Sequence, residues 1–349
     1  KVIELVEEIY HQLSKAYGSP ESKYLPKIFE ICLTKEEVSV LLSLPGTPEE
    51  VAAKLAVEVP KVAEILKKLF NKGFVLYKLV DDKLRYGLNG DLWESILPDK
   101  RDFEKFGEEF LDLWNHYHDD EMMATSDKQY TESYTRVIPV EKTIPMKWGE
   151  ILPYEKISEI LENAKTIAVT ECACRTMSRR CDNPTDVCLL FNEFADIIIE
   201  RGIAKRTSKE EALSILKRCE NLGLVHQLNN VEPEGYQFLC NCCSCCCSIL
   251  RGMIVFGKKG ISAKSRYVSS VDSELCDGCG ICVTRCNFGA MNTVDSKAVV
   301  DKEKCFGCGL CASKCPTHAI QLIPVRGPEH IIDHLEKAPP RLVDTLMIG

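Results

Sequence analysis

Hydrophobic positions in the first third of the chain recur at helical spacing and then change to short apolar runs. The pattern predicts a first helix over Val2–Leu13. A second is predicted to begin at Thr47-Pro48, because threonine caps helices well and proline fits the first helical position. A third is predicted to begin at Pro60 and end at Gly73, since an apolar stripe repeats every three or four residues along it. The stripe consists of Val62, Ile65, Leu66, Leu69 and Phe70.

Two strand-like runs follow the third helix. Phe74–Val80 and Lys83–Leu88 flank Asp81-Asp82, which predicts a hairpin. Helix, turn, helix and hairpin in this order resemble a winged helix-turn-helix domain, here over residues 1–100. The resemblance implies either DNA binding or a structural, partner-docking role. Acidic residues interrupt the basic ones along its exposed face, so nucleic-acid binding is the less favoured of the two.

A connector is expected over residues 101–150. Residues 101–118 predict an amphipathic helix with Phe103, Phe106, Phe110 and Trp114 on one side. A polar cluster ends it, made of His116, His118, Asp119, Asp120 and Glu121. This cluster is either a metal site or a solvated helix end, and the absence of a distinctive ligand spacing favours the second. Residues 123–150 are polar and interrupted by prolines, which predicts a linker or wrapping segment.

The middle region, residues 151–268, mixes helical and strand patterns. Helices are predicted over Pro153–Asn163, 189–202 and 208–222, the last with a capping box of Ser208 and Glu211. Strands are predicted at Thr166–Thr170 and at residues 224–226. The region is therefore expected to fold as an α/β domain.

Ten cysteines lie in two separate segments of this middle region. They are Cys172, Cys174, Cys181, Cys188, Cys240, Cys242, Cys243, Cys245, Cys246 and Cys247. Adjacent residues of an extended chain point to opposite faces, so neighbouring thiols serve one site only if the backbone coils around it. We expect four to six of them to converge on a metal centre. A further iron–sulfur cluster is favoured, and zinc, which also accepts four thiolates, is the alternative. Cys32 and Cys219 are interpreted as buried small hydrophobic residues.

A doubled cysteine motif follows the middle region. Each copy has the spacing C-x2-C-x2-C-x3-C, and the copies begin at Cys276 and Cys305. This stretch, residues 269–325, resembles the bacterial two-[4Fe-4S] ferredoxin module. The resemblance implies crossed ligation, in which the fourth cysteine of each copy binds the other copy's cluster. One cluster would then have Cys276, Cys279, Cys282 and Cys315 as ligands, and the other Cys305, Cys308, Cys311 and Cys286. The proline expected after the fourth cysteine is present at Pro316 but replaced by Asn287 in the first copy, which predicts a looser turn there.

Composition narrows the setting of the protein. Twenty cysteines in 349 residues do not resemble a secreted disulfide scaffold, so a reducing, cytoplasmic and anaerobic environment is expected. No apolar run approaches the ~20 residues of a membrane span. The net charge of −8 does not favour broad nucleic-acid affinity. Residues 326–349 predict a tail with a short helix at 328–337, which docks on the body or on a partner.

Together these patterns predict a multidomain α+β protein with a winged-helix-like domain, a cysteine-rich α/β domain and a ferredoxin-like domain. The leading functional hypothesis is an electron-transfer protein, a subunit of an oxidoreductase with a redox protein as partner. A second hypothesis is a reductase with its active site at the middle-domain centre, where Arg175 and His226 are candidate substrate-orienting or proton-donating groups. A third is a redox-sensing regulator that uses the winged helix. An open cavity at the middle cysteines would favour the second hypothesis.

Overall fold

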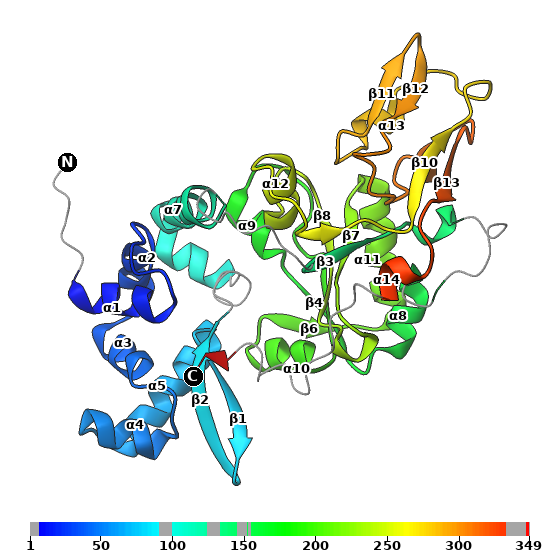
Figure 1. Cartoon of the computed structure of the whole chain (residues 1–349). Coiled ribbons are helices and arrows are strands. Elements are labelled where there is room, and N and C mark those ends of the chain that lie inside the picture. Colours follow the sequence, from blue (N-terminus) through cyan, green and yellow to red (C-terminus); the bar gives the residue numbers. More distant parts are fainter. Residues whose placement is uncertain are drawn as a thin grey trace, which may run out of the picture.

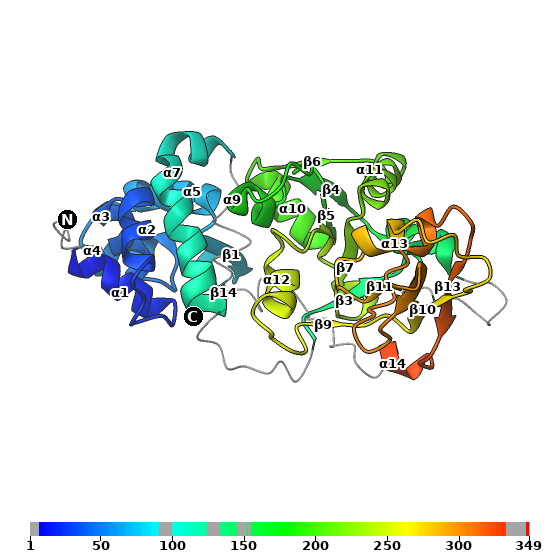
Figure 2. The same ribbon diagram turned by 90° about the horizontal axis from the view of Figure 1, so that it is seen from above.

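The computed structural model describes residues 7–90, 100–123, 133–144, 152, 155–332 and 347–348, with side chains from residue 106 in the second range. Figures 1 and 2 show three successive parts. The helical N-terminal part lies on one side of the middle part, and the ferredoxin segment lies against another side. None of the described helices has the length and apolar character that a membrane crossing requires.

The N-terminal part consists of helices followed by a hairpin, in the predicted order. The elements are α1 (Glu8–Ala16), α2 (Leu25–Cys32), α3 (Lys35–Leu42), α4 (Pro48–Leu55), α5 (Val59–Lys72), β1 (Val75–Val80) and β2 (Lys83–Asn89). Thr47 caps α4 through a capping box with Glu50, and Gly73, with a left-handed φ of 87°, ends α5. The described part of the first helix runs from Glu8 to Ala16, and residues 2–6 of the predicted helix lie outside the described part.

Helix α7 (Lys100–His116) packs on the N-terminal core, as its amphipathic pattern predicts. Phe110, Leu111 and Trp114 are buried there against residues of the earlier helices. Gly107, with φ of 78°, interrupts the helical geometry. The helix continues as a π-helix, η1 (Tyr117–Met123), which faces the middle domain.

The middle domain is built on a seven-stranded sheet with the strand order β6-β4-β5-β8-β7-β3-β9. The strands are β3 (Thr135–Ile138), β4 (Ile167–Thr170), β5 (Cys188–Phe191), β6 (Ala204–Arg206), β7 (Val225–Asn229), β8 (Phe238–Cys242) and β9 (Ser262–Ala263). All neighbours pair antiparallel except β3 and β9, which are parallel.

Two predictions about this sheet are wrong. Residues 188–191 form a strand, because their apolar run pairs with β4 and β8, and only the following residues form a helix. The expected linker contains β3, which is buried along its whole length between β7 and β9. The sheet supplies the hydrogen bonds that make this short segment extended.

Helices cover both faces of the sheet. They are α8 (Ile157–Asn163), α9 (Ala173–Ser178), α10 (Asn192–Glu200), α11 (Lys209–Leu222) and α12 (Ser248–Ile254). Alternate residues of β5 face opposite sides: Leu189 packs with α8 and α11, and Leu190 packs with α10. This two-sided burial explains the apolar runs of β4 and β5, whereas β7 is buried along its whole length with polar residues in it.

The ferredoxin segment contains two short antiparallel strand pairs. β10 (Tyr267–Val271) pairs with β13 (Ile320–Pro324), and β11 (Met291–Val294) pairs with β12 (Lys297–Val300). The remaining elements are α13 (Ile281–Thr284), η6 (Ala312–Lys314) and α14 (Glu329–Ile332). Beyond residue 332 the predicted helix at 328–337 lies outside the described part. The strand β14 (Met347–Ile348) docks on β2.

Candidate metal centres

The ferredoxin segment has two small cavities, each lined by cysteines of both motif copies. The first cavity brings Cys276, Cys279 and Cys282 together with Cys315. The second brings the remaining four together, namely Cys305, Cys308, Cys311 and Cys286. These groupings are the two ligand sets that crossed ligation requires.

The backbone around these cysteines is suited to thiolates. The backbone N–H of Ala290 donates to Cys286 Sγ over 3.2 Å, and that of Ala298 donates to Cys276 Sγ over 3.4 Å. Such donors stabilise negative charge on cluster sulfur and tune its potential. A Cβ at Gly307 would lie 2.1 Å from the carbonyl oxygen of Tyr267, so this loop position admits only glycine. The donor set and the loop shape both fit iron–sulfur clusters.

Asn287 stands where a proline is expected, and its side chain makes hydrogen bonds to the middle domain. Its Nδ2 donates to the carbonyl oxygen of Gly223 over 2.8 Å, and its Oδ1 accepts from the N–H of Ser244 over 3.1 Å. The neighbouring Arg285 donates to the carbonyl oxygens of Glu220 and Asn221 at the end of α11. A proline could make neither side-chain bond, so the asparagine docks the ferredoxin loop on the middle domain.

Six of the ten middle-domain cysteines, called the six-cysteine chain below, line one cavity and lie near enough to one another that each affects the pKa of the next. Its order is Cys172, Cys188, Cys240, Cys242, Cys247 and Cys174. Cys240 and Cys242 share one face of β8 because they are two residues apart. The others lie where strand β5 and helices α9 and α12 begin. The two remote cysteine segments therefore converge, as expected.

Hydrogen bonds between these sulfurs favour thiolates at alternate positions. The Cys240 and Cys247 thiols donate to Cys242 and lower its pKa to about 6 despite burial. Donation from Cys172 and Cys240 lowers the pKa of Cys188 in the same way. Accordingly the pKa of Cys172, which donates to Cys188 and is buried, is raised. Thiolates are the form that binds metal.

The six-cysteine chain borders a cavity of about 630 Å³ between the N-terminal part and the middle domain. Most of its wall is apolar, with residues of β5, α10 and η1 on different sides. Representative apolar residues are Leu190, Phe194, Ile198, Phe238, Met122 and Met123. The polar groups in the wall besides the cysteines include Glu171, Arg175 and Ser248. This combination of size, apolar lining and few polar groups is typical of small-molecule sites.

Arg175 is buried beside the cysteines, with a side chain 2% exposed. Its guanidinium donates to the carbonyl oxygens of Pro184 and Asn241, and to Cys243 Sγ over 3.5 Å. A buried cation is costly without a compensating anion. The adjacent thiolates supply that charge.

His226 does not reach the cavity wall and is not placed for the catalytic role considered from the sequence. It is 1% exposed, and its Nδ1 lies 2.6 Å from Asn241 Oδ1, with Glu220 Oε1 3.7 Å from its Nε2. The ring therefore joins β7 to β8 and α11 as a structural partner.

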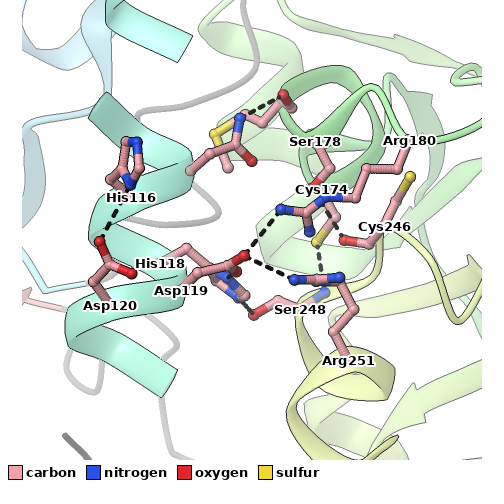
Figure 3. Close-up of polar contacts among 12 residues, drawn as sticks. His116, His118, Asp119, Asp120, Cys174, Ser178, Arg180, Cys246, Ser248 and Arg251 are labelled. Carbon is pink, nitrogen blue, oxygen red and sulfur yellow. Dashed lines mark hydrogen bonds and ion pairs between the residues drawn. The ribbon is translucent and has the colours of Figure 1, made fainter. Parts of the chain in front are cut away.

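Figure 3 shows that the polar end of α7 is not a solvated helix end. His118 is 4% exposed; its Nδ1 lies 2.6 Å from Asp119 Oδ1 and its Nε2 2.8 Å from Ser248 Oγ. Asp119 also pairs with Arg180 and Arg251. The prediction of a solvated end is wrong for these two residues, because η1 docks against α9 and α12.

Ser248 was not singled out by sequence reasoning. It follows Cys247 directly and starts α12, where the only signal would have been its neighbouring cysteines. Since an ionised carboxylate only accepts, His118 Nδ1–H donates to Asp119, and a neutral ring then accepts the Ser248 hydroxyl proton at Nε2. Burial lowers the pKa of His118, which favours the neutral ring. Ser248 thereby connects a histidine–carboxylate pair to the cavity wall.

The four remaining cysteines form a second compact group, and one of them, Cys246, also lines the cavity. These are Cys181, Cys243, Cys245 and Cys246, whose sulfurs all lie within 4.8 Å of one another. Cys32 and Cys219 are buried single cysteines, as predicted.

Comparison with protein families gives a match at one of these sites. Residues 298–321 match the family described as 4Fe-4S binding domain, and this range includes Cys305, Cys308, Cys311 and Cys315. Comparison with curated proteins finds no match to the chain. The family match and the cysteine groups together indicate that the chain is an iron–sulfur protein, with a 4Fe-4S binding domain near its C-terminal end.

Proposed function

We propose that this chain is an electron-transfer protein in which electrons pass between the ferredoxin segment and a further iron–sulfur centre in the middle domain. The two cysteine sets of the ferredoxin segment would hold two [4Fe-4S] clusters, and the six-cysteine chain would hold the further centre. Such clusters supply one-electron chemistry when bound. The chain's own residues supply ligation, burial and hydrogen bonds to sulfur.

The observation that carries this proposal is one continuous apolar contact between the two regions. Phe288 packs in a buried cluster with Cys242 and Cys247, and Cys286 and Cys308 border the same cluster. The rings of Phe288 and Phe306 stack with centroids 4.3 Å apart. The N–H of Val140 donates to the carbonyl oxygen of Cys308 over 2.9 Å. Close, water-excluding packing of this kind joins the second ferredoxin cysteine set to the cavity cysteines.

The opposite end of the ferredoxin segment is suited to a redox partner. Cys279 is exposed, while the second cysteine set is more enclosed. Apolar side chains of Leu275, Ile281 and Val294 are exposed in the same motif copy and its neighbouring hairpin. An exposed cluster edge with apolar surroundings would let a partner protein approach, consistent with a subunit of an anaerobic oxidoreductase.

The cavity favours a second, more specific candidate, in which the chain is itself a reductase. A carrier of electrons alone has no need of a cavity of about 630 Å³ beside its thiolates. Its apolar wall suits a small, largely apolar substrate. Ser248 donates its hydroxyl proton to His118, so its oxygen would accept a hydrogen bond from a molecule in the cavity, and Arg175 would hold negative charge near the thiolates.

Carbon monoxide is a small apolar probe for testing this proposal. Anaerobically purified full-length protein would be reduced and its low-temperature EPR spectrum recorded with and without the gas. We expect a third signal besides the two ferredoxin signals, and only this third signal should change when carbon monoxide is added. The ferredoxin signals should not change, because four cysteines saturate each of those clusters and leave no open position on iron. If the reduced protein shows no third signal, the proposed electron path is wrong. A third signal that ignores carbon monoxide would keep electron transfer and argue against the reductase.

A further inference from the structure

The four-cysteine group has the dimensions of a site for one metal ion. Cys181 Sγ lies 3.8 Å from Cys243 Sγ and 3.6 Å from Cys246 Sγ. With metal–sulfur bonds of about 2.3 Å, the sulfurs of a tetrahedral zinc site are separated by about 3.8 Å. These two separations match edges of a single-ion tetrahedron, and the other four are no longer than 4.8 Å.

A cubane cluster would hold its thiolates farther apart, because each thiolate binds a different iron at a corner of the cube. The ferredoxin segment offers an internal comparison. Within the part of the chain that the structure describes, neither of its cysteine sets draws its sulfurs together within the 4.8 Å that the four-cysteine group shows. The sulfur spacing thus separates the two kinds of site.

The local backbone explains how neighbouring cysteines reach one point. Residues 244–246 form a turn, and the N–H of Cys247 donates to the carbonyl oxygen of Cys243 over 3.1 Å. The turn places Cys243, Cys245 and Cys246 on one side of the segment. Cys181 comes from the loop after α9 and completes the group.

Polar groups around the four sulfurs favour negative charge on them. Arg175 Nη2 donates to Cys243 Sγ over 3.5 Å, and Asn183 Nδ2 donates to Cys181 Sγ over 3.4 Å. Donors of this kind orient ligating groups and stabilise the charge of a four-thiolate site. Arg175 comes from α9, and Asn183 comes from the loop after it, which also carries Cys181 and which the ion would hold in place.

We propose that Cys181, Cys243, Cys245 and Cys246 bind a single zinc ion, separate from the iron–sulfur centre at the cavity. Four thiolates leave no open position, so the ion is structural rather than catalytic. It ties the loop after α9 to the turn between Cys242 and Cys247. The ion thereby fixes the spacing of two cavity cysteines without taking part in electron transfer.

The test measures zinc and iron per chain in full-length protein purified anaerobically from zinc-containing medium. The native chain should hold about one zinc, and X-ray absorption at the zinc edge should show four sulfurs at about 2.3 Å. Cys181→Ser should remove most of the zinc and leave most of the iron. Cys174→Ser, the matched control from the six-cysteine chain, should lower iron and keep zinc.

A conservative variant keeps the test decisive if Cys181→Ser does not fold. Zinc also accepts three cysteines and one histidine, so Cys181→His should retain the ion with one nitrogen in place of one sulfur. An unchanged four-sulfur shell in Cys181→His would overturn the site. Recovery of iron instead of zinc at these thiolates would also overturn it. Neither result depends on whether the six-cysteine chain binds an iron–sulfur centre. Iron content and EPR test that centre independently.

Discussion

At the scale of single residues, cysteines that are neighbours in the sequence belong to different groups. Cys242 lines the cavity, whereas Cys243 belongs to the four-cysteine group and does not line it. Cys247 and Cys246 both line the cavity, but only Cys246 belongs to the four-cysteine group. The sequence predicts convergence of the two segments, because so many thiols need partners. It does not predict the division, because the turn at residues 244–246 decides which sulfurs meet.

Replacing Cys286 tests the crossed arrangement of the ferredoxin cysteines. Cys286→Ala should damage the cluster of Cys305, Cys308 and Cys311, because Cys286 lines their cavity and not the cavity of its own loop. Low-temperature EPR of the reduced variant would show which signal changes. Selective loss of the cluster at Cys276, Cys279 and Cys282 would contradict crossed ligation.

Replacing Asn287 tests its docking role. Asn287→Ala removes its bonds to Gly223 and Ser244, and loss of such partly buried bonds typically costs about 1 kcal/mol. The variant should unfold at lower denaturant concentration, and Asn292→Ala, an exposed change on β11, should not. Equal stability of the two variants would mean that the asparagine contributes nothing to docking.

At the scale of elements, the helices with complete capping signals were predictable and the short strands were not. Ser208 and Glu211 form the predicted capping box, and α11 ends at Gly223. In contrast, β3 and β5 are each four residues long, and their extended form depends on hydrogen bonds to strands distant in the sequence. The π-helix η1 also depends on distant contacts, since Asp119 pairs with Arg180, just after α9, and with Arg251 of α12.

The docking of η1 depends on Asp119. Asp119→Ala would leave Arg180, Arg251 and His118 without their shared carboxylate, and a loss of about 1–3 kcal/mol of stability is typical of such a change. Denaturant unfolding would measure it. Asp120→Ala is the control from the same turn, since Asp120 contacts Tyr24 and His116 on the N-terminal side. It should affect stability much less, and a reversed order would contradict the docking role.

The pH dependence of stability provides another test of this element. Burial lowers the pKa of His118 below its usual value, so the unfolded chain binds a proton more readily than the folded one. The neutral ring's contribution to the free energy of unfolding is complete above a pH of about 6.5, and it is lost as the pH falls toward the pKa of His118 in the folded state. His118→Gln should therefore show a smaller fall in unfolding midpoint between neutral and mildly acidic pH. An identical pH profile in the variant would exclude this contribution.

At the scale of the whole molecule, the cavity lies between parts of the chain that sequence patterns describe separately. Met123 and Ile348 reach it from the N-terminal part and the returning tail, and Cys188 and Ser248 from the middle domain. Sequence patterns could predict the ferredoxin motif, since its spacing is local. They could not predict the cavity, because its wall forms only when η1, β14 and the sheet of the middle domain pack together.

The winged-helix-like part is expected to bind DNA no better than weakly and without specificity. Three of its basic residues pair with acids: Lys61 with Glu36, Lys68 with Glu64 and Arg85 with Glu50. Non-specific binding typically has a Kd of ~10⁻⁴–10⁻⁶ M near physiological salt. A gel-shift assay over a range of salt concentrations would measure it. Tight binding to a discrete sequence would favour the regulator hypothesis.

The central claim is that the six-cysteine chain holds an iron–sulfur centre in addition to the two ferredoxin clusters. The most direct measurement is iron per chain in anaerobically reconstituted protein, together with EPR of the reduced state. The native chain should exceed the roughly eight irons of two cubanes. Cys242→Ala with Cys247→Ala should lower the count to roughly eight and retain both ferredoxin signals, whereas Cys32→Ala should change neither. A native count of roughly eight irons, unchanged in the double variant, would contradict the account.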